Sequence, residues 1–333
     1  MPATPAVEEV RDGLWSVPVP IPNNPLGYTL VYAFVTDSGP VLVDTGWNDD
    51  ASFAALGEGL KVTGHDLADV YGVLITHVHP DHHGLSERVR HVSSAWVAMH
   101  PEDAWLVSMR RQNDDDWLLQ TAAVMLQAGA SAAELAQLPT PDQIPKPELP
   151  SVPNRLFADG DVVDVPGWTV RAIWTPGHSP GHCCFEVDDL LLSGDHVLPK
   201  ITPHIGLYNE ASEMDPLGDY LSSLDRLHQS HAREVLPAHL WRFPDLGGRL
   251  REITEHHEER LAAILSLLKD GPASLWEVTA AMPWNREWDD IHPMMKRAAL
   301  SEALAHIRYL ERRDQIERVP GEWPTTYRLP IPS

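Results

Sequence analysis

The ten residues ITHVHPDHHG, numbers 75–84, constrain this chain more than any other stretch, because they place four histidines and an aspartate directly after an apolar run. The preceding run, DVYGVLITH, predicts a buried strand that ends at His77 and His79. Asp81 and His82 follow round the turn. A loop in this position can direct alternate side chains into one pocket. Zn²⁺ takes three or four nitrogen and oxygen ligands, so the stretch predicts a metal site on a loop.

In three later segments, a histidine or an aspartate also follows directly or closely after an apolar run. His178 lies in TPGHSPGH after VRAIW, Asp195 follows LLLSG, and His239 follows EVLPA. Enzymes of the α/β class build their sites from loops at such strand ends. Six or seven groups suffice for two metal ions that share a hydroxide.

Composition narrows the class of protein and of metal ligand. The only cysteines, Cys183 and Cys184, are adjacent and form no CxxC pair, so a metal would be held by nitrogen and oxygen. Apolar residues at 43% and charged residues at 22% are typical of globular proteins. No apolar run reaches the length of a membrane span, and the first residues are acidic without a secretory apolar core. We therefore expect a cytoplasmic protein without membrane contact.

Periodicity predicts the order of elements and two domains within 333 residues. Strands with turns are expected at 12–47, a helix at 51–60, and two or three helices in an insertion at about 102–138. A proline-rich connector and a second β-rich stretch follow, with an amphipathic helix around 215–230. After residue 250 three helices precede two short strands about a Pro-Gly turn, which is a winged-helix pattern. The predicted domains are 1–250, a catalytic domain, and 251–333.

The ordered motifs HxHxDH, PGHSPGH, SGD and LPAH resemble those of the metallo-β-lactamase superfamily of dinuclear metallohydrolases, over roughly residues 12–245. The resemblance implies an α/β fold, a four-layer αββα sandwich with the metals at one edge between two sheets. Residues 251–333 resemble the small winged-helix domain that often follows this hydrolase domain.

Carried over by position, the resemblance implies a ligand set for two metals. His77, His79 and His178 would bind the first metal. Asp81, His82 and His239 would bind the second. Asp195 would bridge them, as in the glyoxalase II, lactonase and ribonuclease branches. Asp44, in VLVDTG, matches the buried aspartate that supports the metal loop by hydrogen bonds.

Two positions refine that resemblance. His79 stands where the flavodiiron branch carries a glutamate, which favours hydrolysis over redox chemistry. The last histidine usually precedes a glycine, whereas Leu240 and Trp241 follow it here. This departure concerns the shape of the pocket near His239 more than its ligation. His83, His196 and His204 are expected to support loops rather than to bind metal.

The expected activity is hydrolysis of a small carbonyl ester, thioester or lactone by a metal-bridging hydroxide. The expected ions are two Zn²⁺, with iron or manganese as alternatives. Asp81 is expected to hand a proton to the leaving group, and Tyr208, in a loop after Asp195, to hold the substrate carbonyl. The Trp and Met residues of 102–138 and Trp241 suit an apolar small-molecule substrate.

Three other interpretations stay open. A metal-dependent endoribonuclease would suit the winged-helix tail, but the net charge of −23 makes a nucleic-acid partner unfavourable. A non-catalytic metal-binding module would use the same ligands without turnover. A persulfide dioxygenase with one iron would leave Asp81, His82 and His239 unused. Pairing in the resembled family also implies a homodimer.

Overall fold

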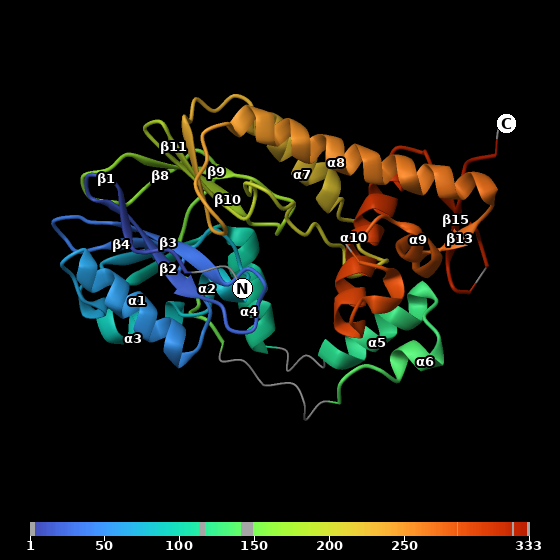
Figure 1. The fold of residues 1–333 in the computed structure, drawn as a ribbon, viewed down its shortest axis with the longest axis horizontal. Coiled ribbons are helices and arrows are strands. Elements are labelled where there is room, and N and C mark those ends of the chain that lie inside the picture. Colours follow the sequence, from blue (N-terminus) through green and yellow to red (C-terminus); the bar gives the residue numbers. More distant parts are fainter. Residues whose placement is uncertain (1–3, 113–116, 141–148, 285, 322, 332–333) are drawn as a thin grey trace. The chain divides into compact units, whose positions relative to one another are not determined.

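A computed structural model describes residues 4–331 apart from 113–116, 141–148, 285 and 322 (Figure 1). The chain divides into two compact units. The first unit comprises residues 1–114, 147–203 and 225–250, and the second comprises 115–146, 204–224 and 251–333. Residues 117–140 and 204–224 thus fall in the second unit together with the helices that follow residue 250.

The first unit contains a seven-stranded sheet in which the strands follow chain order. They are β1 (Glu8–Arg11), β2 (Leu14–Pro20), β3 (Tyr28–Phe34), β4 (Val41–Val43), β5 (Gly72–Leu74), β6 (Trp96–Met99) and β7 (Arg155–Leu156). Strands β1 to β4 pair antiparallel, and β4 to β7 pair parallel. The carboxyl ends of β4 and β5 therefore meet at one edge, where Asp44 and the histidine loop begin.

The second sheet of this unit has five strands in the order β12, β11, β10, β9, β8. Their bounds are β8 (Val162–Val163), β9 (Val170–Trp174), β10 (Cys183–Val187), β11 (Leu190–Gly194) and β12 (Glu234–Pro237). Strands β11 and β12 pair parallel. Their carboxyl ends consequently lie side by side, so the residues that follow them, Asp195 and His239, start from neighbouring points.

Alternation along the strands divides the core into two layers. Val43 and Leu74 pack with Phe185 and Leu192 between the two sheets. Their chain neighbours, such as Leu42, face the opposite side and pack against helices α1 (Asp50–Val62) and α3 (Ser86–Ser93). These buried layers confirm the expected α/β sandwich (Figure 1). Helices α2 (Pro80–His83) and α4 (Pro101–Gln112) follow β5 and β6 in the chain.

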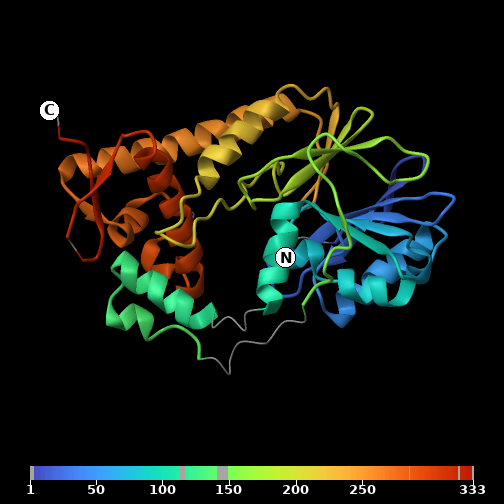
Figure 2. The same cartoon turned by 180° about the vertical axis from the view of Figure 1, so that it is seen from behind.

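The second unit is mainly helical, and α5 packs against α10 (Figure 2). Its helices are α5 (Trp117–Ala128), α6 (Ala132–Leu135), the part of α7 (Pro216–Leu227) up to residue 224, the part of α8 (Leu246–Leu267) from residue 251, η3 (Leu268–Asp270), α9 (Leu275–Ala281), η4 (Trp288–Asp290) and α10 (Pro293–Glu311). Strands β13 (Ala273–Ser274), β14 (Glu317–Arg318) and β15 (Thr326–Arg328) form a sheet in the order β13, β15, β14. Its assignment as a winged-helix domain stays a prediction.

The helices expected in 102–138 are α4, α5 and α6, and they are shared between the two units. Of these three helices, α4 belongs to the first unit, and α5 and α6 belong to the second. Lys296 of α10 binds the Glu134 carboxylate of α6 at 3.1 Å, which ties α6 to the second unit. Within the described part of the chain, no helix is both long and apolar enough to cross a membrane.

Candidate metal centre

The histidine loop is anchored by the carboxylate of Asp44, which follows β4 and is only 1% exposed. The Thr76 backbone N–H donates to Asp44 Oδ1 at 2.8 Å, and the Thr76 hydroxyl donates to Oδ2 at 2.8 Å. His82 Nδ1 lies 2.8 Å from the same Oδ2. Asp44 thus supports both ends of the loop, as the resemblance implies, and turns His82 Nε2 away from itself.

A single helical turn, α2, gives the loop its shape. Pro80 occupies the first helical position, where its missing N–H costs nothing. The N–H groups of His82 and His83 lie 3.1 and 2.9 Å from the His79 carbonyl. Thr45 fixes the far side, because its N–H and hydroxyl donate to the His82 carbonyl at 2.7 and 2.9 Å. Asp81 and His82 are therefore presented from a fixed turn.

His77, His79 and His178 form the first candidate ligand group, whose donor atoms all lie within 4.8 Å of one another. His77 Nε2 lies 3.0 Å from His79 Nδ1 and 3.2 Å from His178 Nε2. Nitrogens bound tetrahedrally to Zn²⁺ at about 2.0–2.1 Å lie about 3.3 Å apart. The three rings therefore already have nearly the spacing of zinc ligands.

The protonation of His77 suits such a role. The Thr76 hydroxyl gives its hydrogen to Asp44, so it accepts from His77 Nδ1–H at 3.0 Å. The His77 Nε2 lone pair then faces the other two rings. Burial, followed by the neighbouring imidazoles, holds the pKa of His77 and of His79 well below the usual value. Both rings are neutral at pH 7, which is the state that binds metal.

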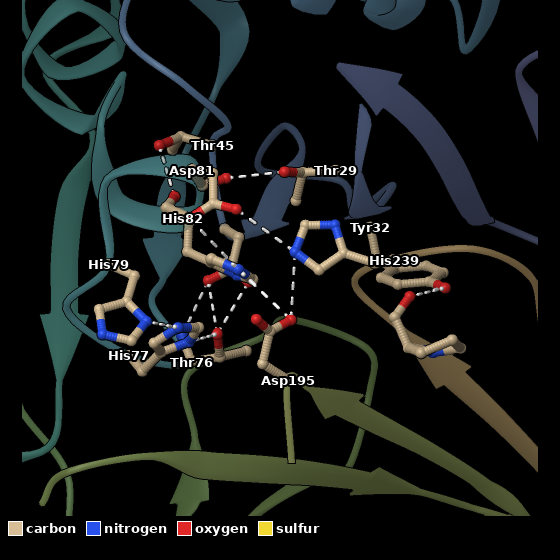
Figure 3. Close-up of polar contacts among 12 residues, drawn as sticks. Thr29, Tyr32, Thr45, Thr76, His77, His79, Asp81, His82, Asp195 and His239 are labelled. Atoms are coloured by element: carbon tan, nitrogen blue, oxygen red, sulfur yellow. Dashed lines mark hydrogen bonds and ion pairs between the residues drawn. The ribbon is translucent and has the colours of Figure 1, made fainter. Parts of the chain in front are cut away.

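Asp81, His82 and His239 form the second ligand group. His239 Nδ1 donates to the Tyr28 carbonyl at 3.0 Å, which leaves His239 Nε2 3.3 Å from Asp81 Oδ2. His82 Nε2 lies 3.8 Å from Asp81 Oδ1. In His82 and in His239, Nδ1 contacts a protein oxygen. In both residues Nε2 faces the Asp81 carboxylate (Figure 3).

Asp195 lies between the two groups. Its Oδ2 is 3.6 Å from His178 Nε2, and its Oδ1 is 3.5 Å from His82 Nε2 and 3.3 Å from His239 Nε2. With His77 and His82 it forms a third group of close ligand atoms. One carboxylate thus offers an oxygen to each side, which is the arrangement that a bridging ligand requires.

Among the described residues, three buried atoms of this centre lie 3.3–3.5 Å from charged neighbours but form no hydrogen bond of good geometry: His82 Nε2, His239 Nε2 and Asp195 Oδ1. Buried polar atoms are normally satisfied, so such a cluster requires an explanation. A cation between them would satisfy all three, and two imidazoles with a carboxylate suit a divalent ion. The residues of this centre are therefore able to bind divalent metal.

Without a cation, the second group retains protons. Burial opposes the charged form of His239, but the Asp195 and Asp81 carboxylates raise its pKa to about 10. Burial likewise opposes ionisation of Asp81, but His82 and His239 lower the pKa of Asp81 to about 2. The carboxylates raise the pKa of His82 well above its usual value against the effect of burial. A metal that binds here must displace these protons.

Residues 24–239 match the sequence model of the metallo-beta-lactamase superfamily. The chain belongs to the metallo-β-lactamase superfamily. A metallo-beta-lactamase family protein from Thermus thermophilus is 32% identical with a TM-score of 0.80, over 97% of this chain and 100% of that chain. A beta-lactamase domain protein from Burkholderia ambifaria is 26% identical with a TM-score of 0.80, over 99% and 95%.

Among curated proteins, the lactamase-like protein adaB of Aspergillus niger is 27% identical, over 83% of this chain and 70% of that protein. Members of the metallo-β-lactamase superfamily are generally hydrolytic enzymes, and this chain is a hydrolase of that fold.

Two buried residues that sequence analysis did not single out support the metallo-β-lactamase centre. His182 Nε2 accepts from the Asp195 N–H at 3.2 Å, and its Nδ1–H donates to the Thr175 hydroxyl at 2.8 Å. Burial lowers the pKa of His182 well below the usual value, so it is a neutral support for Asp195. Asp103, the second, contacts both histidine loops. The repeated PGH in PGHSPGH was the only local signal for His182.

The remaining expected residues lie elsewhere or outside the ligand groups. Tyr208 belongs to the second unit, where its hydroxyl is 3.0 Å from His204 Nε2 and its ring lies under the Arg297 guanidinium. Its contact with substrate stays a prediction. His204 also pairs with Glu302 at 3.4 Å. His83 and His196 are buried in the first unit and belong to none of the three ligand groups. Asp114–Asp116, expected as a solvated turn or the start of a helix, lie outside the described residues.

Proposed function

We propose that this metallo-β-lactamase-fold hydrolase binds two divalent ions, most suitably Zn²⁺, and cleaves a small carbonyl ester, thioester or lactone. The observation that carries the proposal is the convergence of seven donors from four strand ends, with Asp195 directed to both groups. The spacing of the first three nitrogens favours zinc.

Bound divalent ions would supply Lewis acidity to the substrate oxygen and a water that is nucleophilic near neutral pH. The protein residues would fix the geometry and move the proton. Asp81 is ionised at neutral pH because its pKa is about 2. Its side chain is also the most exposed of the second group, at 17%. Asp81 can therefore take the proton from the attacking water and deliver it to the leaving group.

The proposed substrate class rests on charge and on exposed apolar rings. In the first unit Trp105 and Trp241 are 59% and 53% exposed, so indole surfaces are available to an apolar acyl group. A net charge of −23 disfavours a polyanion. Tyr208 is proposed to donate a hydrogen bond to the substrate carbonyl.

The test combines metal analysis with a substrate panel. Purified full-length protein loaded with Zn²⁺ is assayed on aryl esters, thioesters, lactones and single-stranded RNA, beside His79→Ala and the exposed-site control His91→Ala. We expect about two ions per chain, and hydrolysis of a carbonyl substrate that chelation and His79→Ala abolish and His91→Ala preserves. Equal rates for wild type and His79→Ala on every compound would refute the proposal. Cleavage of RNA alone would assign an endoribonuclease, and metal binding without turnover would assign a binding module.

A further inference from the structure

Asp103 is a fully buried acid in the first turn of α4. An acidic residue in the first turn of a helix commonly stays in solvent, where it interacts with the helix dipole. This carboxylate instead lies where two loops of the metal centre meet. A buried carboxylate is unfavourable unless donors surround it, so its position requires a specific set of contacts.

The contacts come from the two loops that carry the first ligand group. Asp103 Oδ2 accepts from the Val78 N–H at 2.8 Å, and Val78 stands between His77 and His79. The same oxygen accepts from the Ser179 hydroxyl at 2.7 Å, and Ser179 directly follows His178. One oxygen therefore joins chain positions adjacent to all three ligands of the first group.

The second oxygen extends this connection. Asp103 Oδ1 accepts from the Gly181 N–H at 2.7 Å. A Cβ added at Gly181 would lie 2.5 Å from the Asp103 backbone nitrogen and 2.8 Å from the Asp103 Cβ. The His178 loop thus approaches α4 as closely as only glycine allows. This close approach makes the contact with Asp103 a built feature of the loop.

The two groups of the centre are supported by different carboxylates. Asp44 contacts His82 of the second group directly, at 2.8 Å. Asp103 acts on the first group through Val78 and Ser179 of the chain beside its histidines. Asp44 also bonds Thr76, which lies beside His77, so its effect extends to the start of the loop.

We propose that Asp103 is the positioning residue of the first metal group, which sets the spacing of His77, His79 and His178 by joining their two loops. The inference rests on the ligand set of the proposed function, but not on its substrate. Loss of an outer partner of metal ligands typically costs about 10–100-fold in metal affinity. Such a loss is expected at the first group, while the second keeps its affinity.

The experiment measures each group alone. The His239→Ala background weakens the second group and isolates the first, and the His79→Ala background isolates the second. Asp103→Asn, Asp103→Ala and Ser179→Ala are introduced into both backgrounds, and the metal-free full-length proteins are titrated with Zn²⁺ against a chromophoric chelator. The visible absorption of bound Co²⁺ reports coordination geometry, and thermal unfolding of the metal-free proteins reports stability.

In the His239→Ala background we expect Asp103→Asn to weaken Zn²⁺ binding about tenfold or more and to alter the Co²⁺ spectrum. Asp103→Ala should have a larger effect, because asparagine keeps one acceptor oxygen, and Ser179→Ala a smaller one. In the His79→Ala background the affinity should stay unchanged. Ser179→Ala and Asp103→Asn keep the test valid if Asp103→Ala fails to fold.

Two outcomes would overturn the positioning role alone. In one, wild type binds two ions and the Asp103 variants bind them with unchanged affinity. In the other, both groups weaken in parallel with the melting temperature, which would make Asp103 merely structural. Wild-type protein that binds no metal would instead remove the ligand set, and with it the proposed function.

Discussion

At the scale of single residues, Leu240 takes a left-handed backbone conformation with φ of +71° directly after His239. Such a conformation is costly for a residue with a branched side chain, and glycine adopts it readily. Two hydrogen bonds from Tyr28 of β3 stabilise the backbone at this position. Its hydroxyl donates to the Leu240 carbonyl at 2.8 Å, and its carbonyl accepts from His239 Nδ1 at 3.0 Å. The departure from the glycine usual in the superfamily thus preserves the turn and adds a side chain beside His239.

Asp81 has two proposed tasks, as a ligand and as a proton carrier. Asp81→Asn is expected to lower kcat by about 10²–10⁴-fold, because an amide can neither accept the proton nor balance the charge of a cation. Zn²⁺ affinity of the second group should also fall. Steady-state kinetics and chelator titration measure the two effects. Asp164→Asn, at an exposed carboxylate paired with Arg155, is the matched control. Wild-type kcat in Asp81→Asn would contradict the proton role.

Tyr208 is predicted to act through its hydroxyl. Tyr208→Phe should lower kcat/KM about fivefold, since a hydrogen bond to substrate contributes on the order of 1 kcal/mol. Tyr309→Phe makes the same chemical change elsewhere in the second unit and should leave kcat/KM unchanged. A Tyr208→Phe enzyme with wild-type kcat/KM on every hydrolysed compound would show that the hydroxyl takes no part.

The convergence of the candidate ligand residues was predictable because each follows an apolar run that predicts a strand, and because four motifs occur in a specific order. Asp103 gave no such signal. It stands among helix formers, and its partners are two backbone N–H groups and the Ser179 hydroxyl, all in segments distant in the chain. The pairing of His182 with the Asp195 N–H was likewise invisible, because sequence spacing does not show which nitrogen faces which neighbour.

At the scale of elements, the turn α2 depends on a glycine that follows it. A Cβ at Gly84 would lie 2.8 Å from the Gly46 carbonyl oxygen and 2.9 Å from the Asn48 nitrogen. Gly84→Ala should therefore displace the turn, lower the free energy of unfolding by about 1–3 kcal/mol, and weaken metal binding. Thermal unfolding and Zn²⁺ titration measure these effects. Gly57→Ala is the control, because its nearest neighbour is the terminal methyl group of the Leu67 side chain. Unchanged stability in Gly84→Ala would contradict the close packing.

Element types were more predictable than their partners. Helix formers at 102–138 predicted helices, and α4, α5 and α6 are there. Their division between two units could not be predicted, because it depends on contacts such as Lys296 with Glu134. Amphipathic periodicity shows that a helix has an apolar face, but it does not identify the surface that covers this face.

At the scale of the whole molecule, acid should destabilise the second unit through two buried histidines. His306 Nδ1 donates to the Glu302 carbonyl at 2.8 Å, and His257 Nδ1 lies 3.1 Å from His306 Nε2. Burial lowers the pKa of His306 to about 4 and that of His257 well below its usual value. Below pH of about 6.5 the unfolded chain therefore binds protons that the folded chain refuses.

The free energy of unfolding should consequently fall as the pH drops from about 6.5 through 4, by roughly 3 kcal/mol from His306 alone at pH 4. Urea unfolding of metal-free protein across this range measures the slope. His306→Gln should lower stability at pH 7 and flatten the slope, whereas His228→Gln, at an exposed site, should keep the wild-type slope. A slope that His306→Gln leaves unaltered would assign the acid sensitivity to other groups.

The positions of the seven donors also decide when this protein can complete its centre during synthesis. His239 follows β12, which pairs with the much earlier β11. A nascent chain that has emerged from the ribosome only as far as residue 195 carries six of the seven donors, but lacks the strand that completes the second sheet. The second group is therefore completed only after translation has passed residue 239.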